Sequence, residues 1–119
     1  MKKAAIIILL VGLIACSLVK ENGIAFELYN NTDMLITNVR FTTSEKIETA
    51  EVDRVEPNEY ASGFLSMKNN IADGAYILAF ARSDGREEKK SAGYYTNGGS
   101  LNKLVRFEIK PDTIIAKFE

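Results

Sequence analysis

The sequence predicts an all-β domain, an antiparallel β-sandwich of about seven or eight short strands. Three observations lead to this expectation. Apolar and polar residues alternate with a period of two along most of the chain after residue 22, which is typical of half-buried strands. Turn-forming residues interrupt the alternation about every 8–14 residues, as they do in sandwiches. No stretch after residue 22 has the sustained apolar spacing of a helix.

Two alternating segments open the domain. Residues 24–29 and 35–41 each place apolar residues on one face, and the Asn-Asn-Thr-Asp sequence at residues 30–33 is typical of a turn. We expect these two strands to pair as a hairpin. The expected inward faces are Ile24, Phe26 and Leu28 in the first strand and Leu35, Thr37, Val39 and Phe41 in the second.

The next segments lead to the most apolar strand. Residues 47–55 match neither the helix nor the strand pattern well, and we favour a strand because Pro57 closes the segment and its neighbours are strands. Residues 60–64 alternate again before a loop at residues 68–70. Residues 75–81 are apolar on both faces, so we expect them at the centre of a packed sheet.

Three strands remain in the last third of the chain. The Ser-Asp-Gly sequence at residues 83–85 is a strong hairpin signal. It precedes a charged strand, residues 86–90, which we place at a sheet edge because Lys and Glu there oppose aggregation. Residues 101–109 and 113–118 form two further strands joined by a turn at Pro111, with Val105, Phe107 and Ile109 pointing inward in the first.

This succession of strands resembles the layer architecture of immunoglobulin-like or transthyretin-like sandwiches, and a small β-barrel is the alternative. The chain has no tryptophan and a single cysteine, so the marker residues of true immunoglobulin domains are missing. The likeness is therefore one of architecture, and architecture alone does not assign a function.

The N-terminus has the features of a secretion signal. Lys2 and Lys3 are positively charged, residues 4–14 are apolar, and Leu13-Ile14-Ala15-Cys16 follows. These four residues match the lipobox pattern of Leu, a small or aliphatic residue, Ala or Gly, and Cys. The N-terminus therefore resembles that of bacterial lipoproteins.

The resemblance implies that Cys16 receives a diacylglyceryl group and becomes the first residue after cleavage, with a further acyl chain such as palmitate in many bacteria. We expect residues 1–15 to be the signal peptide, 16–23 a lipidated tether and 24–119 the domain. The expected location is the bacterial cell envelope, and Ser17 favours the outer membrane where two membranes exist. The alternatives are a conventional secretion signal and an uncleaved membrane anchor, although the apolar run is shorter than the roughly 20 residues that an anchor needs.

Composition argues against most enzyme chemistry. The chain has no histidine, and Cys16 is its only cysteine, so triads, thiol nucleophiles and the usual zinc, copper or haem ligands are missing. We expect no enzyme activity, no catalytic residue, no cofactor and no metal. Calcium is the one metal left open, because aspartates lie beside several turns, but Asp is a common turn residue and no calcium-loop spacing accompanies it. These aspartates are Asp33, Asp73, Asp84 and Asp112.

The charge distribution argues against nucleic-acid binding. The whole chain carries 15 basic and 16 acidic residues, and removal of Lys2 and Lys3 with the signal leaves a net charge of −3. The charges are interspersed, and even the densest cluster, residues 86–90, mixes both signs. No basic stripe is present to replace the counterions of a phosphate backbone.

The most suggestive binding segment is Gly-Tyr-Tyr-Thr-Asn-Gly-Gly at residues 93–99. Neighbouring residues of a strand point to opposite faces, so we expect one of the two tyrosines in the core and the other exposed. Tyrosines beside a polar loop are common in recognition surfaces. We therefore name Tyr94, Tyr95 and Asn97 as candidate contacts for a protein or glycan partner in the envelope.

These observations favour a membrane-anchored, non-enzymatic binding module. One alternative is a structural or assembly accessory of an envelope complex that pairs with neighbours through its edge strands. A less favoured alternative is a small hydrolase that uses two carboxylates, which would require a carboxylate pair facing into a cleft.

Overall fold

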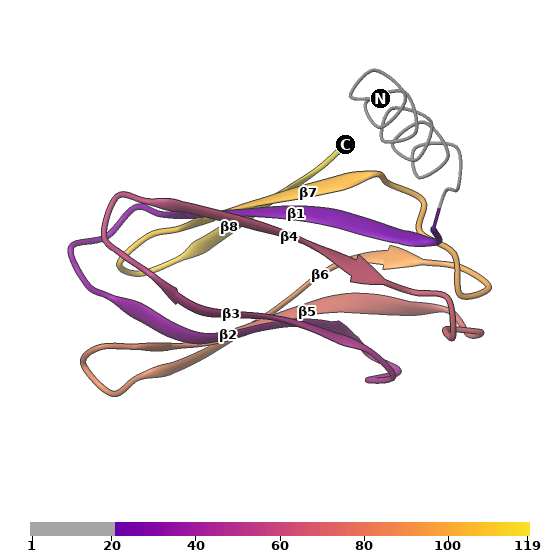
Figure 1. Cartoon of the computed structure of the whole chain (residues 1–119), viewed down its shortest axis with the longest axis horizontal. Coiled ribbons are helices and arrows are strands. Elements are labelled where there is room, and N and C mark those ends of the chain that lie inside the picture. The colour runs from indigo at the N-terminus through magenta and orange to yellow at the C-terminus, as the bar shows by residue number, and fades with distance from the viewer. Residues whose placement is uncertain (1–20) are drawn as a thin grey trace, which may run out of the picture.

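The computed structural model describes residues 21–119, which fold as eight strands and no helix (Figure 1). Cys16, the expected signal peptide and residues 16–20 of the expected tether lie outside the described residues. The strands are β1 (Gly23–Asn30), β2 (Ile36–Thr43), β3 (Thr49–Val55), β4 (Tyr60–Ser66), β5 (Gly74–Arg82), β6 (Glu87–Tyr95), β7 (Leu104–Ile109) and β8 (Ile114–Phe118).

The strands form two four-stranded sheets, ordered β4-β1-β7-β8 and β3-β2-β5-β6, which face each other as two layers (Figure 1). The first is called sheet A and the second sheet B. The expected β-sandwich is confirmed, and the small closed barrel is wrong, because each sheet ends in two edge strands. All strand pairs are antiparallel except β1 and β7, which run parallel.

The expected hairpin between β1 and β2 is wrong, because the two strands belong to different sheets. The connection between them crosses from sheet A to sheet B, and Asn30 holds it. The buried Asn30 amide donates to the Met34 carbonyl at 2.8 Å and to the Val55 carbonyl, in the other sheet, at 3.0 Å. A tight hairpin turn would leave this buried amide without those acceptors.

A bulge in β2 changes the face that its first residues present. The register of β2 against β5 shifts between Thr37 and Arg40, and Asn38 has a positive φ of 52°. Val39 and Phe41 face the core as expected. Before the bulge the buried residue is Ile36, so the expected inward position of Leu35 and Thr37 is wrong.

The other expected strands are present, but the strand expected at residues 101–109 begins only at Leu104, and the charged strand expected at residues 86–90 extends to Tyr95. The ambiguous segment at residues 47–55 contains strand β3, the apolar β5 lies between β2 and β6, and the charged β6 is an edge strand. Within residues 21–119 there is no helix of the length and apolarity needed to cross a membrane.

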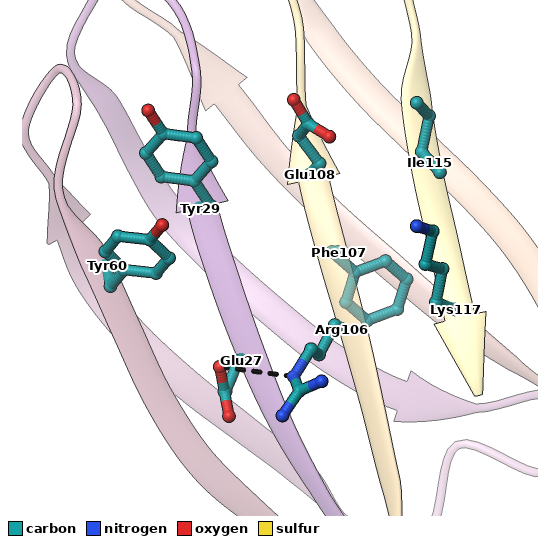
Figure 2. Close-up of a pocket in the computed structure, with 8 residues that line it drawn as sticks. All are labelled: Glu27, Tyr29, Tyr60, Arg106, Phe107, Glu108, Ile115 and Lys117. Atoms are coloured by element: carbon teal, nitrogen blue, oxygen red, sulfur yellow. Dashed lines mark ion pairs between the residues drawn. The ribbon is translucent and has the colours of Figure 1, made fainter. Parts of the chain in front are cut away.

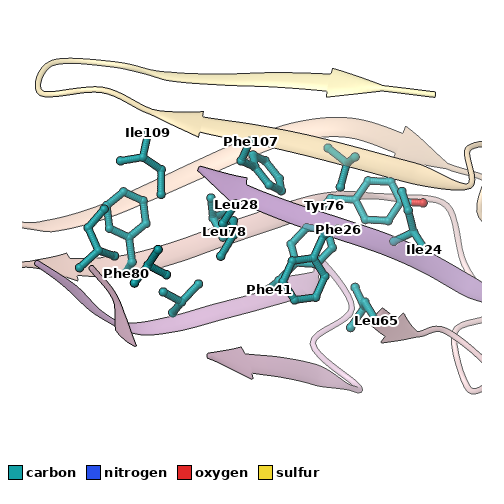
Figure 3. Packing of buried hydrophobic residues seen from close by; sticks show 14 of the residues in the cluster. Ile24, Phe26, Leu28, Phe41, Leu65, Tyr76, Leu78, Phe80, Phe107 and Ile109 are labelled. Atoms are coloured by element: carbon teal, nitrogen blue, oxygen red, sulfur yellow. The ribbon is translucent and has the colours of Figure 1, made fainter. Parts of the chain in front are cut away.

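Aromatic rings from both sheets fill the space between the layers (Figure 3). Phe41 of sheet B is central: its ring centroid lies 5.0 Å from that of Phe26 and 5.5 Å from that of Phe107, both in sheet A. Tyr76 stacks on the same Phe41 ring at 5.9 Å. These offset and edge contacts are the preferred geometries of aromatic pairs, and they join the sheets without a disulfide.

The sandwich has two ends with different loops. We call the proximal end the one where the described chain begins, at Glu21, and where loops 44–48, 67–73 and 96–103 lie. The distal end carries the remaining loops, which are shown at the left of Figure 1. These distal loops are residues 31–35, 56–59, 83–86 and 110–113.

Candidate functional site

The structure separates the two tyrosines that the sequence singled out. Tyr94 is 63% exposed on the surface of β6, whereas Tyr95 is fully buried. The Tyr95 ring packs against Tyr76 in the core, with centroids 5.5 Å apart. Tyr95 is therefore a core residue and not the contact residue that the sequence suggested, because no surface of its ring is left for a partner.

The Tyr95 hydroxyl organises the proximal end. It donates to the Glu45 carboxylate at 2.6 Å, and the Asn70 amide donates to the same carboxylate at 2.9 Å. The backbone N–H groups of Ile71 and Ala72 also donate to Glu45, each at 3.2 Å. These donors lower the pKa of Glu45 from 4.5 to about 2, and the Tyr95 hydroxyl has the largest effect.

A second carboxylate ties the third proximal loop to the others. Asp73 accepts a hydrogen bond of 2.8 Å from the backbone N–H of Asn97, whose φ is 50°. The N–H of Gly98 donates to the Ala72 carbonyl at 2.8 Å. Asn97 is exposed, but its backbone is part of this loop junction. Tyr94 and Asn97 are thus the two sequence candidates whose side chains are exposed, and of these only Asn97 takes part, through its backbone, in the loop junction.

A pocket lies elsewhere, on the outer face of sheet A (Figure 2). Two rows of outward-facing side chains cross the four strands, because each residue stands opposite its partner in the next strand. The row nearer the distal end is Tyr60, Tyr29, Glu108 and Ile115, and the next row is Ser62, Glu27, Arg106 and Lys117.

Two tyrosines form the apolar wall of this pocket. The Tyr29 and Tyr60 rings are stacked, with centroids 4.5 Å apart and an interplanar angle of 15°. Tyr60 stands on edge strand β4 and is 70% exposed, whereas Tyr29 on β1 is half-buried. The pair keeps one large aromatic side chain standing at the surface in a defined orientation.

Charged groups of both signs line the opposite wall. The Arg106 guanidinium lies 3.6 Å from the Glu27 carboxylate and 2.6 Å from that of Glu119. The Asn31 amide donates to Glu108 at 2.8 Å, and Lys117 completes the wall from β8 (Figure 2). A partner that enters therefore meets an aromatic platform beside both acidic and basic groups.

The pocket is small, with a volume of about 190 Å³. Sites for small-molecule ligands usually enclose about 300–1,000 Å³. The space therefore fits one large side chain better than a cofactor. Among residues 21–119 there is no group of three or more acidic or cysteine side chains placed to hold a metal ion.

The sequence pattern contains a signal for this pocket. Alternation in residues 24–29 puts Tyr29 on the face of Glu27, away from the core side chains. In β4 the inward positions at Ala61 and Gly63 are small and only Leu65 is large, while the aromatic residues Tyr60 and Phe64 lie on the outward face. Large aromatics on the outward face of an edge strand indicate a surface for recognition. What alternation does not reveal is that β4 pairs with β1, which brings Tyr60 onto Tyr29.

Comparisons with known proteins define the fold and leave the site open. No protein-family model matches the chain, and no curated protein sequence does so. Among solved structures, the NMR structure of a protein from Eubacterium rectale is similar, with a TM-score of 0.57 and 12% sequence identity. The likeness covers 82% of this chain and 88% of that one. At this identity it shows a shared fold alone.

Proposed function

We propose that the protein is a bacterial envelope lipoprotein, anchored by acyl chains on Cys16, whose domain binds another envelope protein without catalysing a reaction. We further propose that the contact surface is the outer face of sheet A at the Tyr29–Tyr60 pocket. The stacked tyrosine pair is the observation that carries this assignment.

The anchor rests on the sequence. The lipobox at residues 13–16 follows a positively charged start and an apolar segment, in the order that lipoprotein signals use. Two or more acyl chains hold a protein stably on a membrane, whereas a single chain binds it only marginally. Replacement of Cys16 by Ala should abolish labelling of the protein by radioactive palmitate in the producing cell. Labelling that persists in Cys16→Ala would contradict the anchor.

The pocket favours a protein partner over a free small molecule. Tyrosine and arginine are the residue types that most often carry binding energy at protein interfaces. Here Tyr60 and Arg106 flank a space of about 190 Å³, which suits a single inserted side chain. The other partner class that fits the aromatic wall is a glycan, whose sugar ring would stack on the exposed face of Tyr60.

A non-enzymatic role fits the carboxylates of the pocket. Glu27 lies beside the Arg106 guanidinium, and Glu108 accepts a hydrogen bond from Asn31. Both carboxylates stand on the open outer face of a sheet rather than in a cleft between elements. They therefore contribute charge recognition more readily than paired acid–base chemistry, for which one carboxyl must be protonated in a secluded site.

Photo-crosslinking in the living cell tests the assignment. A photoreactive phenylalanine analogue is introduced at Tyr60 in the full-length chain, and in a second strain at Tyr94. The two tyrosines are matched controls, because they are similarly exposed (70% and 63%) at opposite ends of the domain. We expect a discrete protein adduct from position 60, and its loss when Arg106→Ala is added.

Each result has a meaning. An adduct from position 94 alone would return the contact surface to the 93–99 segment. An adduct at position 60 that consists of sugar would mean that the partner is a glycan and not a protein. The absence of an adduct at both positions would refute a binding role for either surface.

A second candidate function, an assembly accessory, is favoured by one observation. Strand β8 is the edge of sheet A and pairs only with β7 among the described residues, and its sequence, Ile-Ile-Ala-Lys-Phe, is mostly apolar. Such an edge can add a strand from a neighbour. If neighbouring copies pair through this edge, light scattering of the purified protein will show an oligomer.

A further inference from the structure

The exposed apolar side chains of the domain are concentrated at the proximal end. Six large hydrophobic residues among residues 21–119 are exposed, and Tyr60 is the one at the distal end. The proximal loops carry three of them: Ile71 is 81% exposed, Leu101 56% and Ile47 46%. Phe64 and Tyr94, on the strand ends that lead into these loops, are the other two.

The three loops that carry these residues are held together as one surface. Glu45, beside Ile47, accepts hydrogen bonds from the backbone of Ile71 and Ala72. Ala72 in turn accepts one from Gly98, in the loop that contains Leu101. The apolar side chains therefore stand on loops that are already ordered. Less conformational entropy is lost when such preordered loops bind a surface.

The loops of the two ends also differ in charge, and Glu21 and Glu119 add two carboxylates beside the proximal loops. The proximal loops carry three lysines, Lys46, Lys68 and Lys103, against three carboxylates, two of which accept the loop hydrogen bonds described above. None of these lysines belongs to an ion pair found within residues 21–119. The distal loops carry five carboxylates against two basic residues: Asp33, Glu56, Glu59, Asp84 and Asp112 against Arg86 and Lys110.

The chain also enters the domain at the proximal end. The Asn22 side chain donates to the carbonyls of Met67 and Gly98, at 3.0 and 2.9 Å, and so fixes the first described residues between two proximal loops. Only residues 17–20 separate Cys16 from Glu21. Even fully extended, that segment spans at most about 18 Å.

We propose that the proximal end docks on the surface of the lipid bilayer, with Ile47, Ile71 and Leu101 in the headgroup zone and the three lysines on lipid phosphates. This inference rests on the anchor at Cys16 proposed above. The headgroup zone of one leaflet is about 5–8 Å thick, so a tether of about 18 Å or less keeps these loops within reach of it. The distal end and the pocket on sheet A then point away from the membrane, toward a partner.

Depth-dependent fluorescence quenching tests the docking. Full-length protein, acylated at Cys16, is reconstituted in vesicles of phosphatidylethanolamine and phosphatidylglycerol. A cysteine introduced by Ile71→Cys is labelled with an environment-sensitive dye, and Asp112→Cys serves as the matched distal control. Both positions are exposed, so neither substitution removes a core contact. With a headgroup-region nitroxide lipid, we expect loss of most of the fluorescence at position 71 and none at position 112.

The outcomes separate the docking from the anchor. If the protein does not float with the vesicles, or floats equally well as Cys16→Ala, the lipid anchor is wrong and the docking falls with it. If it floats through Cys16 but the label at position 71 is quenched no more than at position 112, only the docking is overturned. A third outcome concerns the dye at position 71 in the absence of vesicles. If its emission already reports an apolar environment there and reverts on dilution, the surface binds a second copy of the chain, and this too would overturn the docking.

Discussion

The two ends of the sandwich are stabilised by opposite kinds of group. At the proximal end, the carboxylates of Glu45 and Asp73 accept hydrogen bonds from loop backbone and from side chains. At the distal end, buried side chains donate between the two layers: the Arg82 guanidinium to the Lys110 carbonyl, and the Asn30 amide to the Val55 carbonyl. Loop length follows the same division, because the proximal loops have five to eight residues and the distal loops four or five.

This difference between the two ends shows how residues 21–119 hold their loops in place without a disulfide. Long loops leave many backbone N–H groups unpaired, and a carboxylate between loops can accept several of them at once. Short distal turns satisfy most of their own backbone, so two buried side-chain donors between the sheets, Arg82 and Asn30, are sufficient there. The proximal end can therefore vary its exposed loop tips, such as Ile71, while the carboxylates keep the loops in place.

Arg82 should be the most sensitive position of the distal end. Its side chain is 1% exposed, and it donates to Glu88 and to the Lys110 carbonyl, each at 2.9 Å. Replacement by Ala removes the buried member of a pair whose carboxylate is 30% exposed, empties the space of a buried side chain and leaves a carbonyl without its donor. We expect Arg82→Ala to lower the free energy of unfolding by about 2–4 kcal/mol, measured by urea denaturation.

Arg86 is the matched control for this change. It lies in the adjacent turn and also pairs with a carboxylate, Asp84, but both side chains are more than a third exposed. Exposed pairs contribute about 0–1 kcal/mol, so Arg86→Ala should have little effect. If both substitutions cost the same, burial of Arg82 is not what stabilises the distal end.

Two glycines allow the loops at the two ends to be compared directly. Gly98 (φ 71°) and Gly85 (φ 94°) both have left-handed backbones, so alanine at either position should cost about 1–2 kcal/mol. Of the two, only at Gly98 does the added methyl group collide with another atom, the Asn70 carbonyl oxygen, whereas at Gly85 nothing lies within 4 Å. That collision should add about 1–3 kcal/mol to Gly98→Ala.

Thermal unfolding of the two glycine variants measures the difference. Equal destabilisation by Gly98→Ala and Gly85→Ala would mean that the proximal loops move apart freely, and that the platform carrying Ile71 and Leu101 is not rigid. A larger loss for Gly98→Ala supports the connected platform.

Acid should loosen the proximal end through Glu45. The pKa of Glu45 is lowered from 4.5 to about 2 in the folded protein, chiefly by the Tyr95 hydroxyl. The carboxylate therefore contributes stability that is fully present above pH 4.5 and is lost as the pH falls toward 2. We expect urea denaturation at a series of pH values to show a shallower acid-side decline for Glu45→Gln than for the wild type.

Tyr95→Phe isolates the cause of that behaviour. It removes the hydroxyl that donates to Glu45 and retains the buried ring. NMR titration should show the pKa of Glu45 moving back up toward 4.5. An unchanged pKa in Tyr95→Phe would assign the effect to the Asn70 amide and the loop backbone instead.

Much of the fold follows from local patterns. Alternation correctly predicts the inward faces of β1 and β7, and the doubly apolar run correctly places β5 inside a sheet. The wrong expectations have non-local causes. Sheet membership of β2 depends on a side chain, Asn30, that bonds to a strand 25 residues away. The face of Ile36 depends on a bulge at Asn38, which alternation does not encode.

The site could be predicted only in part for the same reason. The opposite faces of Tyr94 and Tyr95 follow from the strand period, but which of the two is buried depends on contacts of Tyr95 with Tyr76 and Glu45. The outward position of Tyr29 is likewise local, whereas its stacking on Tyr60 requires the pairing of β1 with β4. Pairing between distant strands is the information that a single sequence conceals most completely.

The smallest effect is expected for the tyrosine pair itself, where a double-mutant cycle can distinguish a preformed platform from two independent side chains. Stacked aromatic pairs couple by about 0.5–1.5 kcal/mol beyond their buried area. We expect that coupling between Tyr29→Ala and Tyr60→Ala in urea denaturation, and none between Tyr29→Ala and Tyr94→Ala, because Tyr94 lies at the other end of the domain. A Tyr29–Tyr60 coupling indistinguishable from that control would mean that the exposed ring of Tyr60 is not held in place, and the argument for a ready-made contact surface on sheet A would fail.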